Sequence, residues 1–382
     1  WDVTLVEKEG QLFPWALDAE MAAHVGEHLF ENLVTVHLGT SVQRLEGEEG
    51  RVRRVVTDAG TFDADLVILA TGVKPNVDLA REAGLQLGET GALAVDAQLR
   101  TSDADIYAGG DLVENRHLVT GKSCFIPLGS TANKHGRVIA DAIHGLDTTF
   151  PGVLGTFVCK AFEFNVGSTG LGERAAQEAG YDVLCFAAPG FDRAHYYPDS
   201  ELLGLKIVVE KHSGRLLGLQ AAGKGDAARR IDVAATAITL GARLDQLTQL
   251  DLCYAPPYSA ALDCLLTTIY AANNLRRGML ERTTPFELRQ WLEERDDVVL
   301  LDVRSELEFE RGHVDDPKTV NIPIEQLTSR LEELPSDKHV VCMCLAGIRS
   351  FTAQRILQQK GFERVSSVEG GVYLWPWKDD LL

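Results

Sequence analysis

Two cysteines, Cys342 and Cys344, lie two residues apart in the stretch HVVCMCLAGIRSFTAQRIL, which spans residues 339–357. The apolar run that ends at Cys344 predicts a buried strand, and the run that follows the next loop predicts a helix. Backbone N–H groups and the helix dipole favour a thiolate between a strand end and a helix start. Gly347 lets the loop curl so that its N–H groups face the sulfur, and Arg349 adds positive charge. These residues predict one reactive thiol, at Cys344.

The paired cysteines leave two other kinds of site open, a metal half-site and a redox-active pair. The sequence contains neither a CxxC motif nor a Cys/His spacing that suits zinc. Cys342 lies on the same face of the predicted strand as Cys344, so strand geometry alone does not exclude a disulfide. The other interpretation of Cys342 is a buried thiol of the core. The seven cysteines of the chain are Cys124, Cys159, Cys185, Cys253, Cys264, Cys342 and Cys344.

Residues 284–382 resemble the rhodanese family in four motifs that occur in the family's order. The motifs are DVRSELEFERGH (302–313), NIP (321–323), CLAGIRS (344–350) and EGGVYLW (369–375). The resemblance implies that Cys344 accepts a sulfane sulfur as a persulfide and passes it to a nucleophile, with Arg349 at the rim. Because the family's nucleophile position belongs to Cys344, the resemblance favours a core thiol at Cys342. We interpret Asp302 and Arg304 as a structural pair rather than as catalytic residues. The alternative is a rhodanese-like module that relays or binds without catalysis.

A second group of motifs lies in the first 140 residues, where DVTLVEKE predicts a strand that ends in Glu7. In a dinucleotide-binding fold such an acidic residue binds the ribose 2′-OH, and a Gly-rich fingerprint lies about 20 residues earlier. The chain opens at Trp1, so we expect its natural start to be absent. VILATGVKPN (67–76) and IYAGGDLVEN (106–115) together resemble the two-dinucleotide flavoprotein disulfide reductases.

That resemblance implies sites for two cofactors, FAD and NADH. Gly110 and Asp111 would hold the ribityl and phosphate region of FAD, and a helix that starts in LGSTANKHGR (128–137) would face the flavin ring. The remaining cofactor-binding residues that we expect are Glu7, Gly72, Gly129 and Thr131. Glu7 favours NADH over NADPH, whereas the neighbouring Lys8 leaves NADPH open.

The motifs AHYYPDSELLGLKIVVE (194–210) and LCYAPPYSAALD (252–263) narrow the resemblance further. They are similar to the coenzyme A–disulfide reductases, the NADH-dependent persulfide reductases and the related NADH oxidases and peroxidases. This implies a homodimer in which Tyr258 and Tyr197 reach the partner's active site and orient or protonate a thiolate leaving group. The alternative is that these tyrosines pack a corner beside Pro256 and Pro257.

The order of predicted elements indicates an α/β chain in five parts. We expect a partial Rossmann-like NAD-binding domain, a partial FAD-binding domain, an α+β dimerisation domain, a helical linker and a rhodanese α/β domain. Their ranges are 1–78, 79–148, 149–266, 267–283 and 284–382. Expected local features include a helix from Asp18, a tight turn at Glu49-Gly50 and a strand-like run TFDADLVILATG (61–72). Thr284 to Glu287 predicts a capping box with Pro at the first helical position.

Composition limits the classes of partner. The chain has 382 residues and a formal net charge of −19, which disfavours nucleic acid and anionic membrane surfaces. No apolar run approaches the ~20 residues of a membrane helix. Scattered cysteines without a disulfide framework indicate a reducing compartment, so we expect a cytoplasmic protein.

We therefore expect an FAD- and NADH-dependent reductase of CoA-disulfide, persulfide or polysulfide, with coenzyme A as a ligand or part of the substrate and no metal. Sulfane sulfur would pass through Cys344. In the family a redox cysteine belongs to the early FAD domain, and none of the seven cysteines, Cys124 included, occupies its position. The rival hypotheses are an NADH oxidase or peroxidase, a stand-alone thiosulfate sulfurtransferase and a non-catalytic sulfur-relay adaptor.

Overall fold

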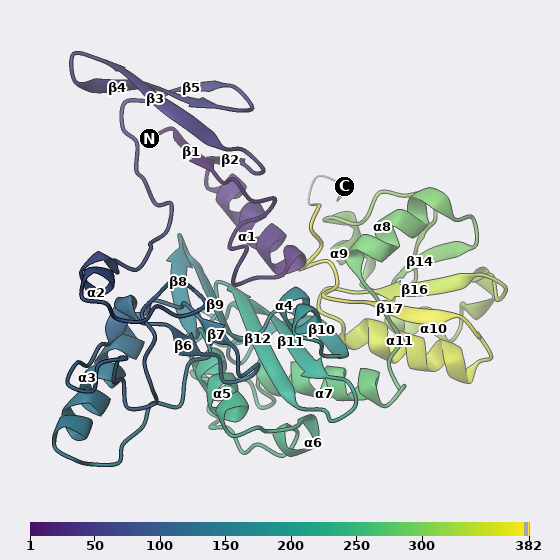
Figure 1. Ribbon diagram of the computed structural model, residues 1–382. Coiled ribbons are helices and arrows are strands. Elements are labelled where there is room, and N and C mark those ends of the chain that lie inside the picture. The colour runs from purple at the N-terminus through teal and green to yellow at the C-terminus, as the bar shows by residue number, and fades with distance from the viewer. Residues whose placement is uncertain (378–380, 382) are drawn as a thin grey trace. The chain divides into compact units, whose positions relative to one another are not determined.

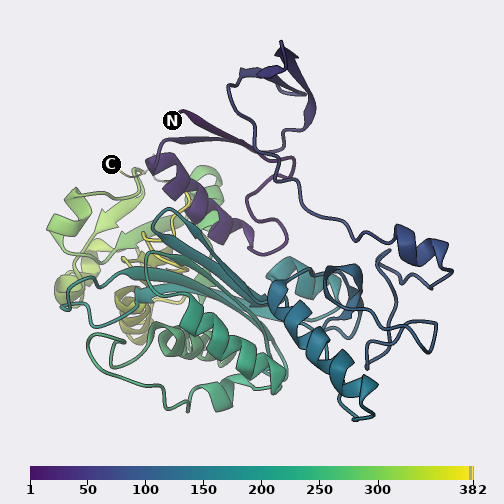
Figure 2. The same cartoon turned by 90° about the vertical axis from the view of Figure 1, so that its left-hand side faces the viewer.

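The computed structural model describes residues 1–377 and 381, which form two compact units. The first unit comprises residues 1–41 and 158–382, and the second comprises residues 42–157. Figures 1 and 2 show the ribbon from two directions. The units are described one at a time.

The first unit opens with two parallel strands, β1 (Val3–Val6) and β2 (Val34–His37), joined by helix α1 (Ala19–Glu31). The expected helix after Asp18 is therefore confirmed, with Asp18 at its N-cap position. Met21 and Val25 of α1 are fully buried and pack against Val166. This packing anchors α1 to the neighbouring sheet.

A five-stranded sheet forms the centre of this unit, in the order β10-β11-β12-β9-β8. Its neighbours β10-β11, β11-β12 and β12-β9 pair antiparallel, as the alternating sequence predicts. The strands are β8 (Phe157–Ala161), β9 (Phe164–Gly170), β10 (Val183–Phe191), β11 (Leu202–Glu210) and β12 (Leu216–Gly223). Gly214, at φ 74°, makes the expected turn between the last two.

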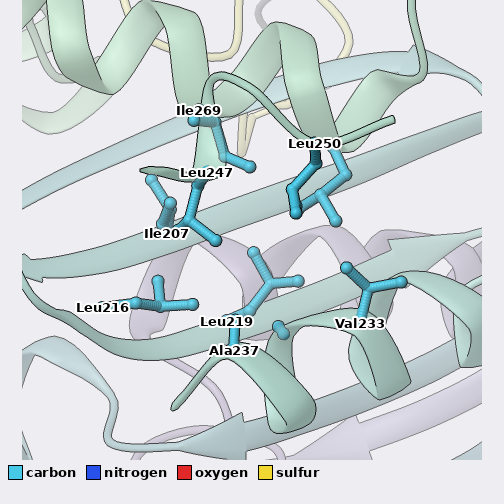
Figure 3. Close-up of a pocket in the computed structure, with 10 residues that line it drawn as sticks. Ile207, Leu216, Leu219, Val233, Ala237, Leu247, Leu250 and Ile269 are labelled. Atoms are coloured by element: carbon cyan, nitrogen blue, oxygen red, sulfur yellow. The ribbon is translucent and has the colours of Figure 1, made fainter. Parts of the chain in front are cut away.

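Helices cover this sheet on both faces, with α1 on one side and α5 and α7 on the other (Figures 1 and 2). The helices of this part are α4 (Glu173–Glu178), α5 (Ala228–Thr239), α6 (Leu244–Leu247) and α7 (Cys264–Arg276). Figure 3 shows the apolar side chains that meet between sheet and helices, among them Ile207, Leu219 and Ile269. They leave a cavity of about 10 Å³, and its apolar lining offers no partner to a water or polar ligand. This region is packed core.

The C-terminal part holds a parallel sheet in the order β13-β17-β16-β14-β15. Its strands are β13 (Arg282–Thr283), β14 (Val298–Asp302), β15 (Thr319–Asn321), β16 (His339–Met343) and β17 (Val365–Val368). Its helices are α8 (Pro285–Glu294), α9 (Glu306–Glu310), α10 (Ile324–Leu327), η2 (Leu331–Glu333) and α11 (Ile348–Gln359). The capping box at Thr284 is present, since its side chain accepts from the N–H of Glu287 and Glu287 returns the bond. A small α/β domain is thereby confirmed.

The second unit contains an antiparallel sheet of β3 (Val42–Glu48), β4 (Arg51–Thr57) and β5 (Thr61–Asp63). Glu49 and Gly50 have positive φ at the turn between the first two strands, as predicted. Its other elements are α2 (Asp78–Glu82), η1 (Gly110–Leu112), β6 (Asn115–Arg116), β7 (Ser123–Cys124) and α3 (Gly129–Ile143).

One expected element of this unit is largely wrong. The strand-like run 61–72 forms a strand only over Thr61–Asp63, and residues 64–77 have no regular structure. Ile68 is 81% exposed and Leu69 is 70% exposed. A strand requires a neighbour that accepts and donates its backbone hydrogen bonds. In this run, Thr61–Asp63 pairs with β4 and the N–H of Ala64 donates to the carbonyl of Arg53 at 2.8 Å, but residues 65–72 belong to no sheet of the described part.

Candidate functional site

Cys344 follows directly after the last residue of β16, at the carboxyl end of the parallel sheet. Alternate residues of the strand point to opposite faces. Cys342 and Cys344 join the core on the face covered by α11, whereas Val341 and Met343 join the core that includes Leu288 of α8. The predicted arrangement of strand, loop and helix around Cys344 is confirmed.

The loop from Cys344 to Gly347 folds back over the sulfur. The N–H of Gly347 donates to Cys344 Sγ at 3.1 Å. Gly347 adopts φ 96°, a left-handed conformation that a glycine takes without strain, and is the N-cap of α11. The sulfur therefore receives a backbone donor at a helix N-terminus, where negative charge is stabilised.

Two serines that the sequence analysis did not single out lie beside the sulfur. Ser350 Oγ is 3.7 Å from Cys344 Sγ and donates to the carbonyl of Gly347 at 2.9 Å. Ser367 of β17 donates to Ser350 Oγ at 2.6 Å. Both serines are buried. Ser350 belongs to the recognised loop motif, so its position gave a signal, whereas Ser367 required the fold.

Arg349 is not a free cation at the rim of the loop. Its Nη1 and Nη2 donate to the two carboxylate oxygens of Glu308, at 2.7 Å and 2.6 Å. Glu308 also accepts from the N–H and hydroxyl of Ser305, with which it forms the capping box of α9. The hydrogen bond from Arg349 lowers the pKa of Glu308 to about 2. The positive charge that the sequence assigned to the loop is therefore balanced by a carboxylate.

Cys342 is fully buried in the core beneath the loop. Burial raises the pKa of its thiol well above the ordinary value, so this thiol is protonated at neutral pH. Cys342 and Cys344 are both free thiols. These features suit a core thiol next to a single reactive one.

Asp302 and Arg304 form the expected structural pair at the end of β14. Both are buried, and Arg304 Nη2 donates to Asp302 Oδ2 at 2.6 Å and to the carbonyl of Gly312 at 2.7 Å. Asn321 donates to the carbonyls of Asp302 and Arg304, both at 2.9 Å. The pair shapes the turn before α9, and α9 carries the partner of Arg349.

A segment after β17 connects the Cys344 loop to the central sheet. The N–H of Val372 donates to the carbonyl of Cys344 at 3.0 Å, and that of Tyr373 donates to the carbonyl of Leu345 at 3.2 Å. On the other side, the N–H of Gly370 donates to Ala187 of β10 at 3.0 Å. The sequence analysis quoted this EGGVYLW segment as a motif but did not predict its contact with β10.

Glu369, at the head of that segment, is 3% exposed. Its carboxylate accepts the N–H of Ala187 and forms an ion pair with Arg282. Gly371 allows the close approach, because a Cβ there would lie 2.3 Å from the carbonyl oxygen of Cys344. Glu369 and Gly371 therefore set the position of the Cys344 loop against the central sheet.

The two predicted tyrosines lie on loops that one hydrogen bond joins. Tyr197 is 36% exposed and Tyr258 is 69% exposed. The N–H of Ala194 donates to the carbonyl of Pro256 at 3.3 Å, which brings the two loops together. Tyr258 is thus largely exposed in this chain, whereas Tyr197 is partly exposed.

Buried charges hold both tyrosine loops. Arg230 donates to the carboxylate of Asp263 from Nε and Nη2, at 3.2 Å and 2.7 Å, and from Nη2 to the carbonyl of Asp192 at 2.5 Å. Ser259, next to Tyr258, also donates to Asp263, at 2.8 Å. These bonds fix the ends of the loops and leave their tips exposed.

The predicted nucleotide residues are placed in both units. Glu7 follows β1 and its carboxylate accepts the N–H of Glu9 at 2.9 Å, at the carboxyl end of a parallel pair of strands. Gly72 lies in the irregular segment 64–77 with φ 88°, and no neighbour would contact a Cβ there. Glu7 is therefore held in a position typical of ribose binding. Around Gly72, by contrast, no atom of the described residues, apart from the adjacent ones, lies within 4 Å of where a Cβ would be.

The predicted flavin residues come together in the second unit. The N–H of Gly110 donates to Nδ1 of His135 at 3.0 Å, so η1 is bonded to α3. Asp111 is exposed, and Gly129 and Thr131 form the first turn of α3, which no side chain caps. The N–H of Thr131 donates to the carbonyl of Leu128 at 3.0 Å, so the N–H groups of Gly129 and Ser130 are the ones at this helix start that suit an outside acceptor. A carboxylate beside such a helix start suits a ligand with both hydroxyl and anionic groups.

His135, which the sequence analysis did not single out, accepts the hydrogen bond that joins η1 to α3. It is fully buried, and burial lowers the pKa of its ring. Neutral imidazole can accept at Nδ1 while Nε2 carries the proton.

Among the described residues, no group of histidine, cysteine and carboxylate side chains is arranged to hold a metal ion. The helices of the described part also include none long and apolar enough to cross a membrane.

Comparison with protein families gives three matches along the chain. Residues 1–136 match the pyridine nucleotide-disulphide oxidoreductase family, and residues 156–265 match the dimerisation domain of the same family. Residues 284–376 match the rhodanese-like domain.

Curated relatives and solved structures agree with these matches. An "NAD(P)H sulfur oxidoreductase (CoA-dependent)" from Pyrococcus furiosus is 41% identical over 265 residues, which cover 69% of this chain and 59% of the relative. The structure of an NAD-dependent persulfide reductase from A. fulgidus superposes with a TM-score of 0.92 at 47% identity, over 98% of this chain and 67% of that one. The reduced CoADR-RHD of Bacillus anthracis gives 0.90 at 36% identity, over 100% and 68%.

The chain spans about three fifths of the length of the curated relatives that it matches. The three family matches follow the order that the sequence motifs predicted, and the two solved structures cover all three regions. The chain therefore belongs to the pyridine nucleotide-disulphide oxidoreductase family, in the form that also contains a rhodanese-like domain.

Proposed function

We propose that this protein is an FAD- and NADH-dependent reductase of CoA-disulfide, persulfide or polysulfide, in which Cys344 carries sulfane sulfur. The observation that carries the proposal is the donor at the sulfur: the N–H of Gly347 lies 3.1 Å from Cys344 Sγ at the start of α11. The names of the Pyrococcus and A. fulgidus relatives support the same substrate class.

The sulfur-transfer step uses groups of this chain. The thiolate of Cys344 attacks the sulfane sulfur of a donor R–S–SH, the new S–S bond forms at Sγ, and the bond to R–S breaks. R–S⁻ leaves with the electron pair and the proton stays on the transferred sulfur, so no external oxidant is required. The Gly347 N–H stabilises the negative charge on Sγ of the thiolate before the attack.

The chain also supplies groups that would hold the cofactors. Gly110, Asp111 and the start of α3 at Gly129 and Thr131 would bind FAD, because an exposed carboxylate and an uncapped helix start fit its hydroxyl and anionic groups. FAD, when bound, supplies the electron transfer that couples NADH oxidation to disulfide reduction.

Glu7 would bind the NADH ribose and favour NADH over NADPH. Gly72 is also retained as a cofactor-binding residue. The carboxylate of Glu7 is held by the N–H of Glu9. A 2′-phosphate would meet that charge, whereas a 2′-hydroxyl can donate to it.

Tyr258 and Tyr197 would orient or protonate a thiolate leaving group in the partner of a homodimer. The exposed side chain of Tyr258 and the family match over the dimerisation domain support this role.

We also propose that the chain divides into five parts, with the ranges 1–78, 79–148, 149–266, 267–283 and 284–382. We propose a cytoplasmic location for the protein, because free thiols persist in a reducing compartment.

A second candidate function is a thiosulfate sulfurtransferase, because the Cys344 site is formed by residues of the rhodanese-like region and its connection to β10. An NADH oxidase is a weaker candidate: relatives with that name exist, but the thiol and donor geometry at Cys344 would then have no use.

The test is thiosulfate:cyanide sulfur transfer by the wild type and Cys344→Ser. We expect the substitution to abolish thiocyanate formation, because serine cannot form a persulfide. Cys253→Ser is the matched control, since Cys253 is exposed and free. Full activity in Cys344→Ser would overturn the assignment of the nucleophile.

A further inference from the structure

Two buried hydroxyl groups form a chain that ends at the sulfur of Cys344. Ser367 Oγ lies 2.6 Å from Ser350 Oγ, which lies 3.7 Å from Cys344 Sγ. Ser350 is 0% exposed and Ser367 is 4% exposed. Neither hydroxyl can exchange its partner for bulk water, so their protons must be shared among the atoms around them.

Counting these protons shows what the thiol form requires. A serine hydroxyl donates one hydrogen bond and can accept two. Ser350 donates to the carbonyl of Gly347 at 2.9 Å, and this leaves its oxygen to accept from Ser367 and from the S–H of Cys344. While Cys344 is protonated, the protons of Ser367, Ser350 and Cys344 therefore each have an acceptor.

The count changes when Cys344 ionises. A thiolate has no proton and only accepts, so the contact between Ser350 and Sγ persists only if Ser350 donates. A hydrogen bond to a charged acceptor is about twice as strong as one to a neutral carbonyl. Ser367 still donates to one lone pair of Ser350. The Ser350 hydroxyl can therefore respond only by rotating, so that its proton points to Sγ of Cys344 instead of the Gly347 carbonyl.

We propose that Ser350 is a further catalytic residue, whose hydroxyl turns from the Gly347 carbonyl to the sulfur when Cys344 becomes a thiolate or persulfide. Ser367 is a positioning residue that acts through Ser350. The sulfur would then have two donors, the Gly347 N–H and the Ser350 hydroxyl. The place of this switch in sulfur transfer rests on the proposed function, but the ionisation of Cys344 can be measured without it.

The hydroxyl chain does not relay a proton. The Gly347 carbonyl is a neutral acceptor and Ser367 already donates to Ser350, so the proton of Cys344 has no route along the chain. It leaves to solvent before the attack on the sulfane sulfur of R–S–SH, and the released R–S⁻ takes up a proton from solvent. Ser350 and Ser367 each keep one proton throughout.

Charged and titratable groups also surround the sulfur. Arg349 of α11 is paired with Glu308 of α9, Asp302 of β14 is paired with Arg304, and the thiol of Cys342 lies two residues earlier on β16. Replacing a serine hydroxyl with a hydrogen atom leaves all of these groups in place. A shift in the ionisation of Cys344 would therefore report on the hydroxyl chain.

The experiment measures the rate at which iodoacetamide alkylates Cys344, across pH, in the full chain. Mass spectrometry of the peptide that contains Cys344 separates it from the other cysteines. We expect Ser350→Ala to lower the rate near neutral pH about tenfold and to move the profile to higher pH, because a hydrogen bond to a charged group is lost. Ser367→Ala should give a smaller shift in the same direction.

Ser366→Ala is the matched control. Ser366 is also buried on β17, but its hydroxyl bonds to Thr283 Oγ1 at 2.5 Å and His339 Nε2 at 2.9 Å rather than to Ser350. We expect its profile to match the wild type within about twofold. Circular dichroism checks that each variant is folded, and Ser367→Ala carries the test if Ser350→Ala does not fold.

Two results would overturn the proposal: a Ser350→Ala profile that coincides with that of the wild type, or one lowered by the same factor at every pH. If Ser350→Ala is unfolded, a wild-type profile in Ser367→Ala would overturn it as well. Failure of the proposed function is a separate result, namely sulfur transfer that survives Cys344→Ser, and it would leave the alkylation profiles unchanged.

Discussion

Arg349 and Glu308 form a two-point ion pair between α11 and α9, although 41 residues separate them in the sequence. The pair cancels the positive charge that follows Cys344. An anionic sulfur donor such as thiosulfate therefore meets a neutral rim. A glutamine at position 308 would keep the shape of the rim, and because it is neutral it would leave the positive charge of Arg349 unbalanced.

We predict that Glu308→Gln lowers the KM for thiosulfate about three- to fivefold, the effect of one partly exposed charge. Steady-state sulfur transfer to cyanide measures this. Glu306→Gln is the control, because Glu306 is an exposed carboxylate on the same helix. An equal KM in the wild type and both variants would show that the ion pair does not influence the donor.

The same pair predicts an acid dependence of stability. Arg349 lowers the pKa of Glu308 from 4.5 to about 2, so the stabilisation is complete above about pH 4.5 and is lost as the pH falls toward about 2. The side chains are 33% and 34% exposed, so solvent screening limits the effect to about 1 kcal/mol. Denaturant unfolding should show a gap between the wild type and Glu308→Gln that closes over this range. A gap that does not depend on pH would contradict the prediction.

Gly371→Ala should displace the nucleophile loop. The new Cβ would lie 2.3 Å from the carbonyl oxygen of Cys344 and 2.6 Å from that of Leu345, closer than any van der Waals contact. We expect sulfur transfer to fall at least about tenfold, because a small misplacement of a reacting group is costly.

Gly361→Ala is the matched control for this loop. Gly361 also has positive φ, at 92°, but a Cβ there would meet nothing within 4 Å. It therefore shares the backbone strain and lacks the clash. Similar activities for the two alanine variants would mean that strain, and not the contact with Cys344, controls the loop.

Glu369→Gln should destabilise the first unit. The substitution preserves the shape and leaves Arg282 without its carboxylate partner in a largely buried position. Removing one member of a buried pair costs about 3–5 kcal/mol, and we expect about 2–3 kcal/mol because 27% of the Arg282 side chain is exposed. Chemical unfolding with Glu363→Gln, an exposed carboxylate, as the control tests this. An unchanged midpoint would show that the pair contributes little.

Cys342→Ala should leave sulfur transfer within about twofold of the wild type, at a stability cost of about 1 kcal/mol for the lost sulfur. Cys342 is fully buried in the core, so it can support the loop only by packing. Thiocyanate formation is the readout. Loss of activity as complete as that in Cys344→Ser would contradict this prediction and favour a redox-active pair of Cys342 and Cys344.

Local signals made much of the Cys344 region predictable. An apolar strand, a glycine and a helix start lie consecutively in the sequence, and the predicted capping box at Thr284 depends on two residues three positions apart. A pattern within one short window was enough to place the thiol at a helix N-terminus. The small α/β domain followed from the alternation of strands and helices.

The partners of these groups were not predictable from local patterns. Glu308 meets Arg349 and Ser367 meets Ser350 only after the strands have been ordered, and Glu369 reaches Ala187 across 182 residues. The apolar run 61–72 failed for a related reason: apolar alternation indicates a strand, but pairing decides whether one forms. The positive charge of Arg349 was correctly read, and its neutralisation required the fold.

The arrangement around Glu369 bears on where this chain can be cut. Arg282 and Thr283 form β13, the edge strand beside β17, and Arg282 neutralises Glu369. A rhodanese-like fragment that begins at residue 284 would lose that edge strand and leave the buried carboxylate of Glu369 without its cationic partner. Excision after Gly278, at the turn that follows α7, would keep both. The boundary of the rhodanese-like domain thus lies several residues before its first helix, α8.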